Sequence, residues 1–89
     1  MKRDWTAYDS AKQSMYIRDE YRCRHCHSKV GLTPHHMQWR SAGGQDTLDN
    51  LITLCIQCHD RVHDGLLEIE WGPLGGDGPV KFIRKAGYR

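Results

Sequence analysis

The sequence predicts a small α+β domain that folds around a bound metal ion. Its 89 residues bury a smaller share of their surface than a larger domain does, and chains of this size often need a metal or disulfide staple. Four cysteines and six histidines supply the ligands for one. Helical spacing ahead of the first cysteines and strand-like alternation after the last ones indicate the mixed secondary structure. We expect residues 1–89 to form a single domain.

Composition excludes several classes of protein. Hydrophobic residues make up 38% and charged residues 27% of the chain, as in ordinary globular proteins. No apolar run approaches the ~20 residues of a membrane span, and the N-terminus lacks the apolar stretch of a secretory signal. We therefore expect a cytoplasmic protein whose cysteines bind metal instead of pairing as disulfides. A formal net charge of +2 permits a nucleic-acid partner without requiring one.

Local patterns in the first half of the chain predict one helix and two strands. The helix is expected to begin at Asp9 or Ser10 and to run to about Asp19, because apolar side chains recur there at helical spacing. Residues 32–37 form a short segment that is apolar at its ends, which favours a strand. Residues 51–54 are apolar throughout and predict a second, buried strand.

The second half predicts another helix and a closing hairpin. Residues 58–64 contain no helix breaker and are followed by Gly65, a frequent residue just after a helix. Apolar and charged side chains alternate over residues 67–71 and again over residues 80–82, with a Gly- and Pro-rich turn between them. This alternation predicts an antiparallel hairpin within residues 66–84.

The cysteines form two C-x2-C pairs, Cys23 with Cys26 and Cys55 with Cys58. Two such pairs can complete a tetrahedral zinc site with no position left for substrate, so the ion is expected to be structural. A thioredoxin-like redox role is the alternative, but the chain has two pairs and no βαβ pattern around either. His25 and His27 lie beside the first pair. Four sulfurs already complete the site, so we expect these two histidines to be exposed turn residues.

Four more histidines indicate a second metal site. His59 and His63 are four residues apart on the predicted helix, so both rings face one side. His35 and His36 are adjacent on a predicted strand and point to opposite faces, so one of them can join the helical pair. A catalytic ion has few protein ligands and leaves room for water. Three histidines as ligands, with the fourth as a base, fit this division.

The order of these motifs resembles that of the HNH endonucleases, most closely the stand-alone, cysteine-bearing branch of bacteria and phages. The matching residues run from about 20 to 65: Cys23-x2-Cys26, Pro34-His35-His36-x3-Arg40, Gly43-Gly44, Asp49-Asn50-Leu51-Ile52-Thr53-Leu54-Cys55-x2-Cys58-His59-x3-His63. The resemblance implies a ββα-metal, treble-clef-like domain. In that fold a β-hairpin packs on a helix and one catalytic divalent ion lies between them, while the cysteines hold a structural Zn²⁺.

The resemblance also implies roles for individual residues. His35, His59 and His63 would hold the catalytic ion, and His36 would be the general base that activates water. Asn50 would brace the loop that carries the base, and a backbone carbonyl or an amide near it would hold the other ring nitrogen of His36. Many relatives have aspartate in the place of His35. Three neutral imidazoles suggest that Mn²⁺, Co²⁺, Ni²⁺ or Zn²⁺ would serve as well as Mg²⁺.

Basic and aromatic residues supply candidates for contacts with nucleic acid. Arg40 is the candidate phosphate clamp, since a guanidinium grips two oxygens in fixed geometry, although a structural or solvated arginine is an equal alternative. Arg18 and Arg24 belong to a set of basic residues that could follow a phosphate backbone, but for any single one of them ordinary solvated charge is the favoured interpretation. Trp71 is expected in the core. Trp39 lies in the loop beside the histidines and is the candidate for base stacking.

We therefore expect a metal-dependent endonuclease that hydrolyses DNA phosphodiester bonds, by nicking or double-strand cleavage, with low sequence specificity. The family resemblance implies 5′-phosphate and 3′-hydroxyl ends. The expected assembly is a monomer or a weak dimer. One alternative is a non-catalytic treble-clef zinc module that binds nucleic acid or protein. Another is an accessory nuclease that acts with a phage terminase or another protein partner.

Overall fold

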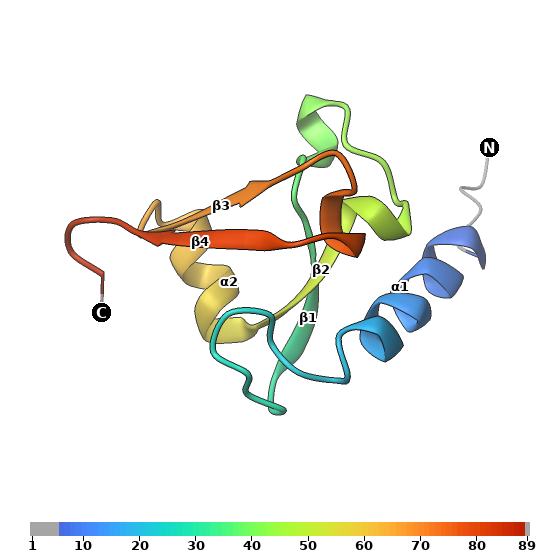
Figure 1. The fold of residues 1–89 in the computed structure, drawn as a ribbon, viewed down its shortest axis with the longest axis horizontal. Helices are drawn as coiled ribbons and strands as arrows, with labels where there is room; N and C mark the ends of the chain where they lie inside the picture. The colour runs from blue at the N-terminus through green and yellow to red at the C-terminus, as the bar shows by residue number, and fades with distance from the viewer. Residues whose placement is uncertain (1–5, 89) are drawn as a thin grey trace.

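A computed structural model describes residues 6–88 of the chain, so residues 1–5 and 89 lie outside the described part. Its helices and strands are α1 (Thr6–Arg18), β1 (Leu32–His36), β2 (Leu51–Cys55), α2 (Ile56–His63), β3 (Leu67–Trp71) and β4 (Val80–Arg84). The strands form two separate antiparallel pairs, β1 with β2 and β3 with β4. Helices α1 and α2 lie on opposite sides of the β1–β2 pair (Figure 1). The successive elements β1, β2 and α2 form a ββα unit, which confirms the predicted α+β class. Among the described residues, no helix is long and apolar enough to cross a membrane.

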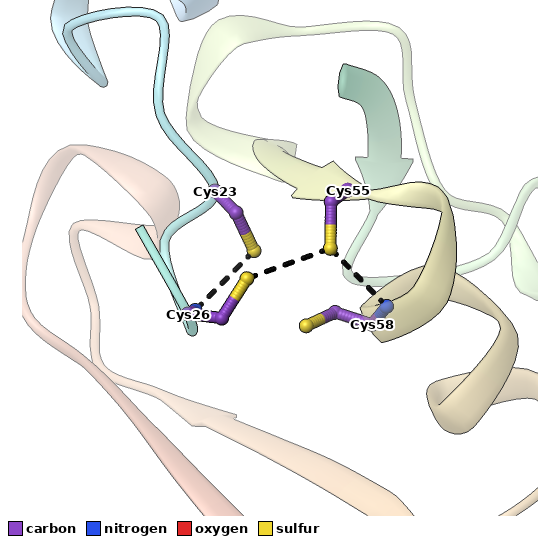
Figure 2. A group of neighbouring side chains, drawn as sticks. All are labelled: Cys23, Cys26, Cys55 and Cys58. Carbon is purple, nitrogen blue, oxygen red and sulfur yellow. Dashed lines mark hydrogen bonds between the residues drawn. The ribbon is translucent and has the colours of Figure 1, made fainter. Parts of the chain in front are cut away.

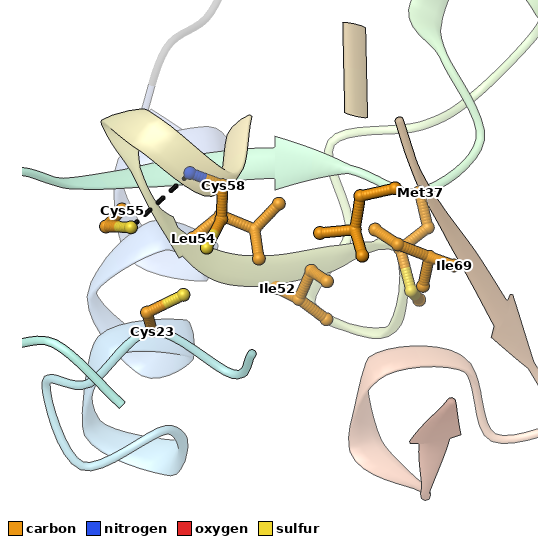
Figure 3. Close-up of a cluster of buried hydrophobic side chains, with 8 residues drawn as sticks. Cys23, Met37, Ile52, Leu54, Cys55, Cys58 and Ile69 are labelled. Atoms are coloured by element: carbon orange, nitrogen blue, oxygen red, sulfur yellow. Dashed lines mark hydrogen bonds between the residues drawn. The ribbon is translucent and has the colours of Figure 1, made fainter. Parts of the chain in front are cut away.

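The buried strand β2 is the centre of the molecule. All five of its residues are buried, because α1 covers one side of the β1–β2 pair and α2 the other. Ile52 and Leu54 are fully inaccessible and cluster with Met37 and Ile69 (Figure 3). Burial of such side chains stabilises each by roughly 1.5–3 kcal/mol relative to exposure. The predicted buried strand is therefore present, one residue longer than expected.

Strand register separates the two adjacent histidines. His35 pairs with Ile52 and His36 pairs with Leu51 across the antiparallel ladder. Successive strand side chains point to opposite faces, so the His35 ring meets the rings of α2. The His36 ring stacks instead on Tyr8 of α1, with 5.9 Å between ring centroids. The alternation expected from the sequence is thus realised.

Both helices begin earlier than the sequence predicts. Helix α1 begins at Thr6, and Asp9 lies in its first turn, where a carboxylate interacts favourably with the helix dipole. Helix α2 begins at Ile56, two residues before the predicted start. The reason is that Cys55 has extended backbone geometry and its sulfur accepts a hydrogen bond from the Cys58 amide, so a metal-ligand candidate also caps the helix.

A buried charge cluster attaches α1 to the rest of the domain. The Asp19 carboxylate accepts two hydrogen bonds from Arg18, one from Arg24 and one from the Thr53 amide, all between 2.9 and 3.0 Å. Burial raises the pKa of Asp19, but these hydrogen bonds and charges outweigh it and leave the pKa below its usual value. Arg24 also donates to the Gly76 carbonyl at 2.8 Å. Neither ordinary solvated charge, the favoured expectation, nor contact with a phosphate backbone describes Arg18 and Arg24, because both guanidinium groups are engaged inside the fold.

The hairpin of β3 and β4 closes over α2 and corresponds to the hairpin predicted from alternation. Leu67 and Ile69 enter the core, while the alternating residues Glu68 and Glu70 face solvent. The turn of this hairpin lies against β2 so closely that a Cβ at Gly76 would be 2.5 Å from the Leu51 carbonyl oxygen. Glycine is therefore required there.

Candidate metal centres and active site

Four cysteine sulfurs meet where three parts of the chain converge. Cys23 and Cys26 lie in the turn after α1, Cys55 ends β2, and Cys58 lies in the first turn of α2 (Figure 2). The four sulfur atoms lie within 4.8 Å of one another, and those of Cys26 and Cys55 are 3.5 Å apart. Sulfurs bound to one tetrahedral zinc at about 2.3 Å lie about 3.8 Å from each other. The donor set fits a closed structural zinc site.

Backbone hydrogen bonds and burial act in opposite directions on the pKa of these thiols. Backbone amides of His25 and Cys26 donate to the Cys23 sulfur at 3.4 and 3.5 Å. Burial raises the pKa of the Cys23 thiol, but hydrogen bonds from backbone amides lower it by more, so the pKa is below its usual value. Burial and the neighbouring cysteines raise the pKa of the Cys58 thiol. Binding of a metal therefore has to displace protons, and the fold and the ion are coupled.

His25 differs from its prediction. It is half-buried, its ring packs 4.9 Å from that of Phe82 on β4, and its Nδ1 lies 3.3 Å from the Cys58 sulfur. The expectation of an exposed turn residue is wrong for His25, because a strand outside the cysteine motifs covers the turn. His27 is exposed as predicted.

Arg61 of α2 contacts Tyr88 and lies 4.0 Å from the Cys58 sulfur, so it faces away from His59 and His63 on the same helix.

Three histidines converge on the other face of the ββα unit. The His35 ring centroid lies 4.9 Å from that of His59 and 6.1 Å from that of His63, and the two helical rings are 4.8 Å apart. One nitrogen from each ring lies within 4.8 Å of the others. The tertiary structure therefore brings together the three residues predicted as ligands. Such a set fits a divalent ion of borderline softness.

Burial keeps the imidazoles of His35 and His59 neutral, which is the form that donates a lone pair to a metal. His35 is only 3% exposed, and burial followed by the charges of His59, His63 and His36 lowers its pKa to about 3. Burial also lowers the pKa of His59, and His63 adds to the effect. At neutral pH, protons therefore do not compete with a cation for His35 or His59.

Thr33 sets the orientation of His59, and the sequence patterns did not single it out. Its hydroxyl donates its single proton to the Leu54 carbonyl oxygen at 2.8 Å. Nδ1 of His59 lies 2.8 Å from the same hydroxyl oxygen, so this nitrogen must carry a proton and donate. The lone pair of the neutral ring is then on Nε2. Thr33 and His35 are two residues apart on β1 and share a face, which is the signal that could have identified Thr33.

His36 belongs to a different network. Its Nε2 lies 2.7 Å from Oδ1 of Asp46, and the same oxygen accepts a hydrogen bond from Nε of Arg40 at 2.9 Å. The expected backbone carbonyl or amide partner of His36 is therefore wrong: the partner is a carboxylate. Because an ionised carboxylate only accepts, Nε2 carries the proton and Nδ1 keeps the free lone pair. Asp46 was not singled out, and an acidic residue in a Gly-rich loop after paired histidines is its only sequence signal.

Asn50 connects the two ends of the loop that contains Asp46. Its side-chain oxygen accepts from the Gln38 amide at 2.8 Å, and its side-chain nitrogen donates to the carbonyls of Gln38 and Gln45 at 3.0 and 2.9 Å. In the same loop, a Cβ at Gly44 would be 1.7 Å from the Gln38 carbonyl oxygen. The amide side chain and the glycine together hold this loop in a tight shape.

A pocket of about 280 Å³ lies over the three histidines. Its lining also includes His36, Trp39 and Arg40, so all four predicted active-site histidines border one space, although the His36 ring itself stacks on Tyr8. Arg40 lies over the Tyr8 ring, 5.0 Å from its centroid, as well as against Asp46. The pocket thus combines a ligand set, a separately held imidazole and a guanidinium.

The ββα unit, the sulfur cluster and the histidine cluster together define a small metal-binding domain of the ββα type. Comparison with known proteins gives the particular family: the family model described as HNH endonuclease matches residues 23–65. The chain belongs to the HNH endonuclease family.

Two relatives illustrate the range of this similarity. The chain is 33% identical over 67 residues to the probable mobile endonuclease C of Enterobacteria phage T4, covering 75% of this chain and 32% of that protein. It is also 33% identical over 72 residues to anaredoxin of Nostoc sp., covering 78% of this chain and 91% of that protein. The chain therefore spans about a third of the phage protein and most of the cyanobacterial one. No solved structure matches it significantly.

Proposed function

We propose that the chain is a metal-dependent endonuclease that hydrolyses phosphodiester bonds of DNA. The observation that carries this proposal is the division of labour among four histidines around one pocket. His35, His59 and His63 turn one nitrogen each toward a common point, while His36 is held apart by Asp46. Family membership and the name of the phage relative support nuclease activity in general.

The proposed chemistry assigns a task to each group. His35, His59 and His63 would hold a divalent ion, which would supply neutralisation of the phosphate charge and stabilisation of the leaving oxygen. His36 accepts the proton of the attacking water at Nδ1, since its Nε2–H is committed to Asp46. The Asp46 carboxylate fixes the ring orientation and stabilises the imidazolium that forms. Asn50 holds the loop that carries this carboxylate.

Arg40 is the proposed phosphate contact. Its Nε donates to Asp46, which holds the guanidinium beside His36 in the lining of the histidine pocket. Arginine suits this position because its planar fork binds two oxygens at once. Its side chain is 41% exposed, so substrate can reach it.

Substrate and product features follow from the same proposal. We infer low sequence specificity, 5′-phosphate and 3′-hydroxyl products, and either nicking or paired cuts by a monomer or weak dimer. The ligand set of three imidazoles favours Mn²⁺, Co²⁺, Ni²⁺ or Zn²⁺ beside Mg²⁺. If the protein acted as an accessory nuclease with a phage terminase, it would have a protein partner, but the proposed phosphodiester hydrolysis would be the same.

A non-catalytic zinc module is the second candidate. The relative of which this chain covers 91% is named anaredoxin, which is not a nuclease name. In this alternative the cysteine cluster organises a surface for nucleic acid or protein, and the histidine pocket has no turnover. The alternative leaves the separate support of His36 by Asp46 without a purpose.

Plasmid cleavage distinguishes the two candidates. Purified zinc-loaded protein is incubated with supercoiled plasmid and Mg²⁺, Mn²⁺, Co²⁺, Ni²⁺ or Zn²⁺ in turn. We expect nicked product with at least one ion, and a loss of about 10²-fold or more in His36→Ala, whose metal content and circular dichroism stay unchanged. Absence of product above a chelator control with every ion would favour the zinc module. Unchanged cleavage by a folded His36→Ala variant would remove His36 from the mechanism.

A further inference from the structure

A second pocket adjoins the histidine pocket and has no role in the proposed cleavage step. It measures about 250 Å³ and shares the side chains of His35 and Trp39 with the first pocket. The remaining lining is mostly apolar: Met37, Val62, Leu67, Ile69 and Trp71, with Gly65, Glu68 and Lys85. The two pockets are therefore neighbouring parts of one continuous surface, with the wall between them formed by a candidate metal ligand and a tryptophan.

Two half-exposed tryptophans line this second pocket. Trp39 is 47% exposed and Trp71 is 46% exposed, so the expectation that Trp71 lies in the core is wrong. Trp71 is the last residue of β3 and shares a strand face with Leu67 and Ile69, but it lies beyond the buried part of that strand. A large apolar ring left in water costs hydrophobic free energy, and tryptophan at such positions is typical of binding surfaces.

The charge of the pocket favours an uncharged occupant. Its two charged side chains, Glu68 and Lys85, form an ion pair with each other at the rim. The remaining side chains offer apolar surface and aromatic faces. The volume lies just below the roughly 300–1,000 Å³ of pockets for drug-sized ligands. Such a pocket suits one flat aromatic group, and it does not suit a phosphate.

We propose that this second pocket binds one unstacked nucleobase of the substrate strand, an inference that rests on the proposed nuclease function. A strand whose phosphate lies at the histidines has a neighbouring base beside Trp39, because the two pockets share that side chain. The Trp39 ring lies 5.3 Å from the ring of His63, so the base would lie close to the reacting phosphate.

Binding of a base in the second pocket should depend on whether the DNA is single-stranded or paired. A base enters the pocket only after leaving its neighbours in the stack, and the free-energy cost of this step is highest in an intact duplex and lowest in a single strand or a distorted site. Stacking on aromatic side chains offsets part of this cost. The protein should therefore bind single-stranded or locally unpaired DNA more tightly than intact duplex.

The test measures binding instead of cleavage. A fluorescently labelled single strand and the matching duplex are titrated with the His36→Ala protein, and anisotropy reports the dissociation constant at fixed salt. The single strand should bind more tightly. Trp71→Leu removes the aromatic face but keeps an apolar side chain, and it should weaken single-strand binding about tenfold with less than a twofold effect on the duplex. Trp71→Phe should keep most of the single-strand affinity.

Tyr21→Ala is the matched control, since Tyr21 is an aromatic residue with 51% exposure that lines neither pocket. It should bind both DNA forms as the parent does. The base site would be contradicted if Trp71→Leu and Trp71→Phe bound the single strand with equal affinity. It would also be contradicted if Trp71→Leu lost equal affinity for the single strand and for the duplex. A parent protein with no preference for the single strand would contradict it as well.

The outcome for the base site is separable from that for the nuclease. If the unmodified protein cuts no plasmid with any ion, but Trp71→Leu weakens single-strand binding, then the base site is supported and the cleavage proposal is contradicted. If the unmodified protein cuts plasmid, but substitution of Trp71 leaves single-strand binding unchanged, then the cleavage proposal is supported and the base site is contradicted.

Discussion

Nδ1 of His59 lies 2.8 Å from the hydroxyl oxygen of Thr33, and that hydroxyl donates its proton to the Leu54 carbonyl. A helix residue is thus oriented by a side chain and a backbone group of the two paired strands. Because the hydroxyl has no second proton, the contact selects one tautomer of His59 and leaves Nε2 to bind a metal. The ββα unit therefore orients its candidate ligand before any ion arrives.

This contact predicts a role for Thr33 in metal affinity. Thr33→Val keeps the shape of the side chain but removes the hydroxyl, so affinity at the histidine site should fall about 10- to 100-fold. Thr33→Ser keeps the hydroxyl and should bind nearly as the parent does. Titration with Co²⁺, followed by its visible absorption, measures both. Equal affinities of the Val and Ser variants would show that the hydroxyl does not orient the ligand.

Asp46 should matter for turnover and little for metal affinity. Asp46→Ala leaves the Nε2–H of His36 without its acceptor, and plasmid cleavage should fall by about tenfold or more. Asp49→Ala changes an exposed carboxylate of the same loop and serves as the control with unchanged cleavage. If Asp46→Ala lost the catalytic ion as well, the carboxylate would belong to the metal site and not to the base.

The Asp19 cluster should dominate the attachment of α1. Asp19→Asn removes the charge that faces two arginines inside the fold, and breaking a buried ion pair costs about 3–5 kcal/mol. Urea unfolding of the zinc-loaded protein measures this loss. Asp9→Asn is the control: its carboxylate forms an exposed pair with Lys12, and the change should stay within about 0.5 kcal/mol. Similar effects of the two substitutions would contradict the structural role of Asp19.

Removal of zinc should unfold the domain. Structural zinc in small domains contributes on the order of 10 kcal/mol, and the sulfur cluster joins the turn after α1 to β2 and α2. A strong chelator should abolish the helical circular dichroism signal, and added Zn²⁺ should restore it. Cys55→Ala should lower solubility first and activity second, because Cys55 also caps α2. A soluble, active Cys55→Ala protein would mean that the ion is dispensable.

Acid should destabilise the protein through His35 when no ion occupies the histidine site. Its pKa is about 3 in the fold and about 6.5 when unfolded, so the unfolded chain binds more protons between these values. The free energy of unfolding therefore falls as the pH drops below about 6.5, by about 2 kcal/mol at pH 5 from this residue. Unfolding curves at pH 7 and pH 5 measure the slope, and His35→Asn should show a smaller one. Equal slopes for the parent and the variant would show that another group is responsible for the loss of stability in acid.

Much of the domain is readable from spacing along the chain. These relationships are local: two residues separate the paired cysteines, three residues separate His59 from His63, and His35 and His36 are neighbours on a strand. Local geometry turns each of them directly into a direction in space. The sequence by itself therefore determined the family, and it predicted which cysteines and which histidines lie together and that His36 lies apart from the other histidines.

Only the tertiary structure decided which polar groups become partners. Thr33 reaches His59 across the strand–helix contact, Asp46 reaches His36 across a folded loop, and Asp19 attracts Arg18 and Arg24 into the interior. A hydroxyl, a carboxylate or a guanidinium is compatible with either water or protein as its partner. Its role depends on what the fold packs against it, and no local spacing carries that information.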